Sequence, residues 1–232
     1  MSILTSFKKR STLDAAIKQV AKARKSETGM AEQLYKGAYQ GFASVIADNL
    51  MLSEALYHWG FALLHEAETQ AQEQAIETLE DAISKFSFCL LTSPNYLGAA
   101  IDGGVAFMEL ARISPDESKD YLYKMARQFF EKAGGIQKGS AAYNLACIHA
   151  LHVDEEACQA ALQQAREYGS LPDVEVILQD ADMANVHDLP WFKEFIEELR
   201  IKPDPESRRE KVEIDFEPKF NLKKTEDFDY YS

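Results

Sequence analysis

The chain has 232 residues, of which 46% are hydrophobic and 27% charged, and its formal net charge is −13. A chain of this length can bury a substantial core, whereas 7 prolines and 11 glycines are too few for an all-β fold with its many turns. No apolar stretch approaches the roughly 18 uncharged residues that cross a bilayer, so the sequence predicts no integral membrane segment.

Charge divides the chain into three predicted segments. Residues 1–28 carry seven Lys or Arg against two acidic residues and predict a basic N-terminal helix, which either contacts an anionic surface or is a solvated helix face. Residues 29–200 carry 11 against 27 and predict an acidic helical domain that repels nucleic acid, so no nucleic-acid partner is expected. Residues 201–232 predict an extended acidic and aromatic tail.

Apolar residues recur at helical spacing along almost the whole chain. Pro94, Pro115 and the pair Gly134-Gly135 are interpreted as helix stops, and a further break is expected in the polar residues 66–73. No alternating β-branched run occurs before residue 212, so the predicted fold class is all-α. The first three predicted helices cover residues 11–26, 31–49 and 51–65. The next three run from the polar break to residue 93, from after Pro94 to residue 111 and from after Pro115 to residue 132, and the last two cover residues 140–151 and 154–169.

Small residues recur with a spacing of 44 in the middle of the chain. The matching positions are Gly60 with Gly104 and Ala82 with Ala126. A shorter third unit places Ala146 at the position of Gly60 and Gly104, and Cys158 at the position of Ala82 and Ala126. Small side chains are needed where the two helices of a hairpin cross, because larger ones hold the helices apart. This pattern, with Pro94 closing the first unit, resembles the tetratricopeptide family over roughly residues 50–200. Residues 178–192 resemble the segment that closes some bacterial arrays of that family.

The resemblance implies antiparallel helix hairpins in a right-handed solenoid, with an extra N-terminal helix pair and an extended C-terminal tail. In that family the first helix of each hairpin lines a concave groove. The implied partner-binding residues are Tyr57, Phe61, Ile101, Val105, Met108, Tyr143, Asn144 and Cys147. None of these positions is Lys or Arg, which disfavours a clamp for a peptide carboxylate. An apolar groove with acidic edges suits an amphipathic helix or extended peptide with basic flanks; alternatively, these residues pack inside the chain.

Catalysis and metal binding have one candidate group. His149 and His152 lie three residues apart, close to Asp154, and an i, i+3 histidine pair with a carboxylate can bind zinc. No third ligand is marked by its position, and histidines at a helix end also interact favourably with the helix dipole. We therefore expect no enzyme activity, no catalytic residue, no metal and no cofactor, with a metal-binding or enzyme-like module as the alternative.

The tail alternates apolar and charged residues over 212–222 and ends in aromatic residues set among acidic ones. Solvated tails rarely keep so many aromatic side chains. The tail is therefore expected to dock on its own body or on a partner protein. Its candidate contact residues are Phe216, Phe220, Phe228 and Tyr230.

These observations predict a non-catalytic adaptor or scaffold subunit that binds one or more proteins within a larger assembly. By analogy with small arrays of the family, the more specific prediction is a bacterial secretion-system component or chaperone. The three cysteines, Cys89, Cys147 and Cys158, are unclustered and indicate reduced thiols. Residues 1–10 lack the order of a secretory signal, so a cytoplasmic location is predicted.

Overall fold

The computed structural model describes residues 3–47 and 51–201, and within them the chain is entirely helical. The elements are α1 (Ile3–Ala23), α2 (Thr28–Ile46), α3 (Leu52–Ala67), α4 (Gln72–Thr92), α5 (Leu97–Ile113), α6 (Asp116–Ile136), α7 (Ala142–Leu151), α8 (Glu155–Glu167), α9 (Val174–Gln179), the 3-10 turn η1 (Ala181–Met183) and α10 (Pro190–Ile201). The all-α prediction is confirmed. The predicted tail residues Phe216, Phe220, Phe228 and Tyr230 lie outside the described residues.

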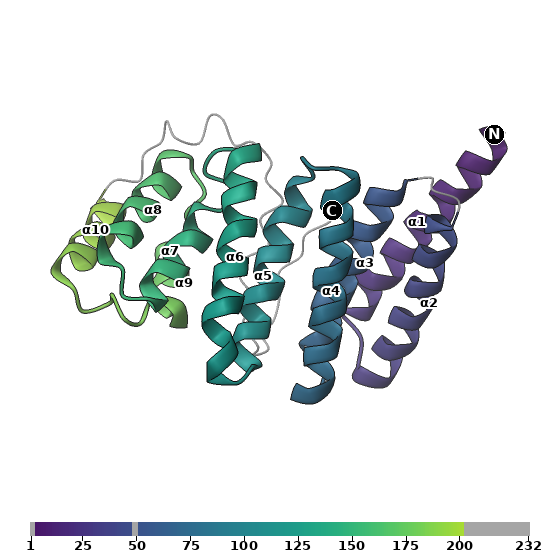
Figure 1. The fold of residues 1–232 in the computed structure, drawn as a ribbon, viewed down its shortest axis with the longest axis horizontal. Coiled ribbons are helices and arrows are strands. Elements are labelled where there is room, and N and C mark those ends of the chain that lie inside the picture. Colours follow the sequence, from purple (N-terminus) through teal and green to yellow (C-terminus); the bar gives the residue numbers. More distant parts are fainter. Residues whose placement is uncertain (1–2, 48–50, 202–232) are drawn as a thin grey trace.

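Helices adjacent in sequence pack as pairs, and the pairs stand side by side in a row (Figure 1). The closest partners are α1 with α2, α3 with α4, α5 with α6, and α7 with α8, while α2·α3, α4·α5 and α6·α7 contacts join successive pairs. The predicted helix hairpins are therefore confirmed. No described helix combines the length and the apolar character needed to cross a membrane.

Two hairpins, α3 with α4 and α5 with α6, each have a close crossing at one of the predicted small residues. A Cβ placed on Gly60 would lie 2.9 Å from the ring of Phe86, and one on Gly104 would lie 2.5 Å from the ring of Phe130. Both rings are fully buried. Because the two contacts are spaced by 44 residues on both helices, the sequence repeat is a repeat of one packing contact.

The largest differences from the sequence-based expectation are at two helix boundaries. The first helix begins at Ile3, eight residues before its expected start at residue 11. The predicted stop at Gly134-Gly135 is wrong, because α6 continues through both glycines to Ile136. Glycine weakens a helix by only about 1 kcal/mol relative to alanine, and the packing of Phe130 and Ala133 outweighs that cost. The chain turns later, at Gly139, where φ is +80°.

The core consists of two buried clusters that meet at α3. One buried cluster runs from α3 to α10, and a second joins α1 and α2 to α3. Trp59 and Phe61 of α3 pack against both clusters, and the Trp59 ring stacks on Tyr39 of α2 at 5.8 Å between centroids. The N-terminal helix pair therefore packs directly onto the repeat array.

The segment after α8 folds back and covers the far end of the array. The Ser170 hydroxyl donates a hydrogen bond to the Gly139 carbonyl oxygen at 2.6 Å, and Asn185 Nδ2 donates to the Ala150 carbonyl oxygen at 3.2 Å. Ile177, from α9, and Met183, from η1, are fully buried. These contacts place η1 beside α7, which matters for the site described next.

The hairpin crossings provide a direct test of the fold. We expect Gly104→Ala to lower the free energy of unfolding by about 1–3 kcal/mol, because the added methyl group overlaps the Phe130 ring. Gly134→Ala is the matched control: it lies in a helix with open space around it, so it should raise stability by up to about 1 kcal/mol. Denaturant unfolding of both variants measures the difference, and equal effects would contradict the crossing.

Candidate functional site

A row of aromatic and polar side chains runs along one face of α3. Tyr57 and Phe61 have ring centroids 6.2 Å apart, and the Phe61 and His65 centroids are 4.3 Å apart. His65 Nδ1 lies 2.7 Å from a Glu68 carboxylate oxygen, and the Arg24 guanidinium lies over the Phe61 ring at 5.4 Å. The spacing of four, four and three residues keeps these side chains on one face of the helix.

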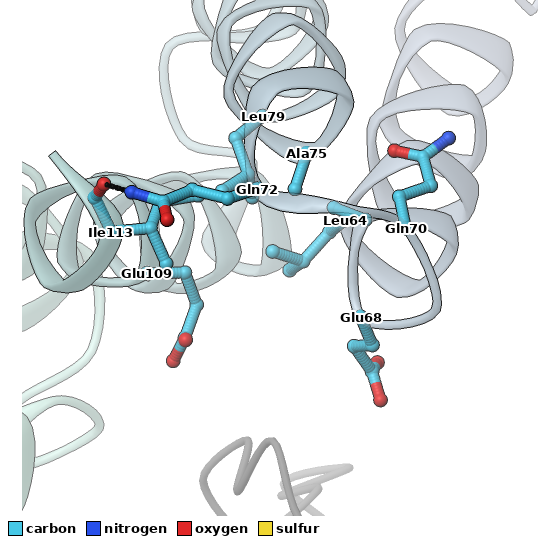
Figure 2. A pocket seen from close by; sticks show the side chains of 9 residues that line it. Leu64, Glu68, Gln70, Gln72, Ala75, Leu79, Glu109 and Ile113 are labelled. Carbon is cyan, nitrogen blue, oxygen red and sulfur yellow. Dashed lines mark hydrogen bonds between the residues drawn. The ribbon is translucent and has the colours of Figure 1, made fainter.

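A pocket of about 180 Å³ continues this face toward α5. Its walls come from the end of α3, the start of α4 and the end of α5 (Figure 2). Leu64 and Leu79 supply apolar surface, and the Glu68 and Glu109 side chains extend to the same side of the pocket. Gln72 Nε2 donates a hydrogen bond to the last carbonyl oxygen of α5 at 2.6 Å, which ties α4 to α5 here.

Arg112 joins α5 to the turn η1. Its guanidinium pairs with Glu109 one turn earlier and with Asp182, whose carboxylate oxygen lies 2.7 Å away. Both carboxylates are only 5% exposed. Burial raises the pKa of Glu109 against the opposing effect of Arg112. Burial also acts to lower the pKa of Arg112, but the two carboxylates outweigh it and raise that pKa.

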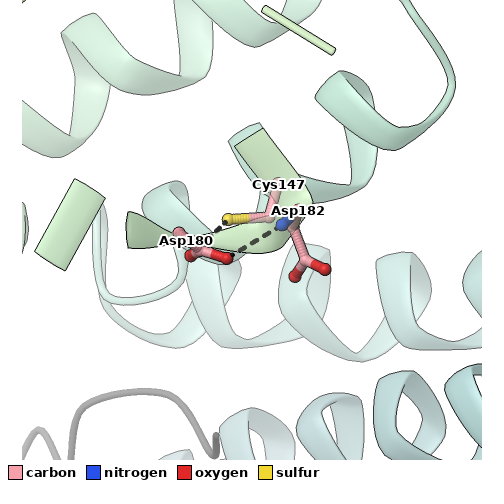
Figure 3. A group of neighbouring side chains, drawn as sticks. All are labelled: Cys147, Asp180 and Asp182. Atoms are coloured by element: carbon pink, nitrogen blue, oxygen red, sulfur yellow. Dashed lines mark hydrogen bonds between the residues drawn. The ribbon is translucent and has the colours of Figure 1, made fainter. Parts of the chain in front are cut away.

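Asp180 is the centre of a second network, between α7 and η1 (Figure 3). It accepts hydrogen bonds from the Tyr143 hydroxyl at 2.8 Å, from the Cys147 thiol at 3.7 Å and from the Asp182 backbone N–H at 3.0 Å. Burial is the largest cause that raises the pKa of Tyr143, so its hydroxyl keeps the proton that it donates. The Asp180 side chain caps η1 through this last hydrogen bond, and Asp182 is buried beside Arg112.

Cys147, Asp180 and Asp182 bring one possible metal-ligand atom each within 4.8 Å of one another (Figure 3). The Cys147 sulfur and the Asp180 carboxylate already take part in the hydrogen bonds described above, and the Asp182 carboxylate pairs with the Arg112 guanidinium. The guanidinium already supplies the positive charge that a bound cation would otherwise supply. A metal would have to displace both the guanidinium and the thiol proton. The residues present therefore fit a protein network better than a metal centre.

The histidine alternative is not supported by the geometry. His152 Nδ1 bonds to the Ile148 carbonyl oxygen at 2.8 Å, and His149 Nδ1 lies 3.8 Å from a carboxylate oxygen of Asp154. Among the described residues, neither histidine belongs to a cluster of three possible ligands. Burial lowers the pKa of His149, which favours its neutral form. Both residues lie at the end of α7, as the helix-end interpretation predicts.

The eight predicted groove residues fall into two groups by their degree of burial. Tyr57, Phe61, Ile101 and Val105 are partly buried and lie on α3 and α5. The other four are 3% exposed or less, which favours the alternative that they pack inside the chain: Met108, Tyr143, Asn144 and Cys147. Their role in partner binding stays a prediction.

Two residues of the site could not be assigned to it from sequence. Arg112, which is not among the eight predicted positions, lies between Glu109 and Asp182. The spacing of Glu109 and Arg112 permits an ion pair on a helix, but Asp182 is 70 residues away and no local pattern links it to them.

Together these contacts form one region, which we name the inner face. Its partly or fully exposed residues are Tyr57, Phe61, Glu68, Ile101, Val105, Arg112 and Asp180, and behind them lie the buried Leu64, His65, Glu109, Tyr143, Cys147 and Asp182. It combines aromatic and aliphatic side chains with four carboxylates and the Arg112 guanidinium, and the Arg24 guanidinium lies over its Phe61 ring. Such a surface is suited to binding an apolar segment that carries positive charges.

Comparison with known proteins gives a family match. A family model described as "Plant specific mitochondrial import receptor subunit TOM20" matches residues 30–169. From Arabidopsis thaliana, mitochondrial import receptor subunit TOM20-3 is 27% identical over 111 residues, 47% of this chain and 55% of the relative. Subunit TOM20-1 is 32% identical over 99 residues, 42% of this chain and 50% of the relative. The chain thus spans about half the length of these curated relatives. No solved structure matches.

These matches correct several predictions made from the sequence. The expected bacterial secretion-system component or chaperone is wrong, because the family and both relatives are plant mitochondrial proteins by name. The simple cytoplasmic location is wrong for the same reason. The likeness of residues 178–192 to a bacterial terminal segment is not supported either. By contrast, a receptor subunit agrees with the expectation of a protein-binding chain without catalytic activity.

The Arg112 network can be tested by removing its positive charge. Arg112→Met leaves two buried carboxylates without their partner, and breaking such pairs typically costs about 3–5 kcal/mol. Because the Arg112 side chain is 26% exposed, we expect a loss of about 2–3 kcal/mol in the free energy of unfolding. Adding Glu109→Gln and Asp182→Asn should restore at least half of it. A single-variant loss below about 0.5 kcal/mol would show that the network does not hold η1.

Proposed function

The chain belongs to the plant-specific TOM20 family of mitochondrial import receptor subunits, and we propose that it is a non-catalytic receptor subunit that binds amphipathic, positively charged segments of other proteins on its inner face. The observation that carries this proposal is that an aromatic row on α3 lies beside a pocket lined by Glu68 and Glu109. The Arg112 guanidinium links Glu109 to Asp182, whose backbone N–H bonds to Asp180, so four carboxylates lie in the same region. We further interpret the helix pairs as tetratricopeptide-like repeats, with their first helices lining the binding surface.

The chemistry of the inner face matches both sides of an amphipathic helix. Tyr57, Phe61 and Leu64 offer apolar contacts to the apolar stripe of such a helix. Glu68 is exposed at the edge of the pocket and would attract Lys or Arg from the neighbouring stripe, whereas the buried Glu109 is already paired with Arg112. Residues 51–201 carry 25 acidic against 10 basic residues, so the charge of the whole array favours a basic partner.

Affinity for a basic amphipathic peptide tests this function. The probe is a fluorescent helical peptide with leucines on one face and arginines beside them, measured by anisotropy against the full chain. Phe61→Ala should weaken binding by about tenfold or more, because aromatic anchors dominate such interfaces. Glu68→Gln should have a smaller effect that disappears at high salt, because Glu68 is at the exposed edge.

The matched controls are Phe88→Ala and Glu80→Gln, both exposed residues of α4 outside the inner face. They should leave the affinity unchanged. A peptide of the same apolar pattern with glutamates in place of arginines should bind at least about tenfold more weakly. Equal binding of the two peptides, or an equal loss in the control variants, would contradict the proposed site.

A further inference from the structure

The outer face of α1 presents an aromatic residue and a line of lysines to solvent. Phe7 is 77% exposed, and Lys18 and Lys22 are also exposed. Lys18 follows Phe7 by 11 positions and Lys22 follows Lys18 by four, and both spacings return to the same face of an α-helix. The opposite side of α1 packs against α2 through Leu13 and Val20, which are buried. From Phe7 to Lys22 the face is about 22 Å long.

The basic groups of this face are only partly engaged by the rest of the chain. Arg10 pairs with Asp14 and Glu54, at 3.2 and 2.9 Å. In the described part of the chain, no ion pair involves Lys8, Lys18 or Lys22, and these three lysines are exposed. Unpaired lysines are common on solvated helices. The location and the neighbours of these three lysines therefore decide whether they form an interaction surface.

Two features distinguish this set from an ordinary solvated face. First, α1 and α2 form one end of the row of helices (Figure 1), and residues 3–46 hold eight basic against three acidic residues, whereas residues 51–201 hold 10 against 25. An anionic surface therefore attracts this end and repels the remainder. Second, Phe7 places an exposed aromatic ring on the lysine-bearing face, which suits the boundary between lipid headgroups and acyl chains.

We propose that the outer face of α1 is a docking surface for a bilayer that contains anionic lipids. Lys8, Lys18 and Lys22 contact the headgroups, and the Phe7 ring enters the headgroup layer. This contact leaves the inner face on α3, α5 and α7 available for a protein partner. The inference goes beyond the proposed receptor function and does not depend on it, because α1 contributes no residue to the inner face.

Vesicle binding of the full chain tests the proposal. The probes are phosphatidylcholine vesicles with and without phosphatidylserine, compared by co-sedimentation at low and high salt. Binding is expected only with phosphatidylserine and should fall as salt rises. The triple variant Lys8→Glu, Lys18→Glu and Lys22→Glu should bind at least about tenfold more weakly, because each lysine near an anionic surface adds to the attraction. Phe7→Ser should also weaken binding, by a smaller factor.

The control variant makes the same change in net charge elsewhere. Lys124, Lys132 and Lys138 are exposed lysines on or just after α6, and replacing all three by glutamate should leave vesicle binding unchanged. Equal binding to neutral vesicles, full binding by the α1 variant, or an equal loss in the control would each overturn the proposal. So would binding of a DNA duplex as tight as that of the anionic vesicles. Binding of the amphipathic peptide should be the same in both triple variants, which separates this test from that of the receptor function.

Discussion

The Phe130 ring lies so close to the backbone of α5 that a single Cβ on Gly104 would come within 2.5 Å of it. This contact sets the distance between the two helices of the hairpin, and the same contact between Gly60 and Phe86 sets it in the preceding hairpin. Because the contact repeats, α3 and α5 take equivalent places in successive hairpins, and their partly buried residues form one surface. The surface that we propose as the binding site is therefore a consequence of how the small residues are spaced.

The electrostatics of the inner face follow from its partial burial. Asp182 and Glu109 are held in the protein by one guanidinium, and Asp180 is held by a hydroxyl, a thiol and a backbone N–H. Buried carboxylates need such partners because an unpaired buried charge is costly. Since four carboxylates outnumber the guanidinium groups of Arg112 and Arg24, the inner face keeps a negative charge. An acidic surface that also carries Tyr57 and Phe61 discriminates by charge as well as by apolar contact.

Much of the fold could be predicted from sequence, because helix periodicity, proline breaks and small-residue spacing are local signals. The stop expected at Gly134-Gly135 failed because tertiary packing of α6 outweighs a weak propensity. The ion pair between Arg112 and Asp182 could not be foreseen, because it depends on how the segment after α8 folds back onto α7. The predicted bacterial and cytoplasmic setting was wrong for a different reason. Helices pack in the same way in any cellular compartment, so the family match, and not the helix pattern, indicates the location.

We propose that the inner face of α3, α5 and α7 binds a basic amphipathic segment. The most direct measurement is backbone amide NMR of the full chain during titration with the arginine-bearing peptide. Shift changes are expected to concentrate on Phe61, Glu68, Val105 and Glu109 and their neighbours, and to spare exposed residues of α4 such as Phe88. Changes concentrated on the exposed faces of α4 and α6, or none at saturating peptide, would contradict it.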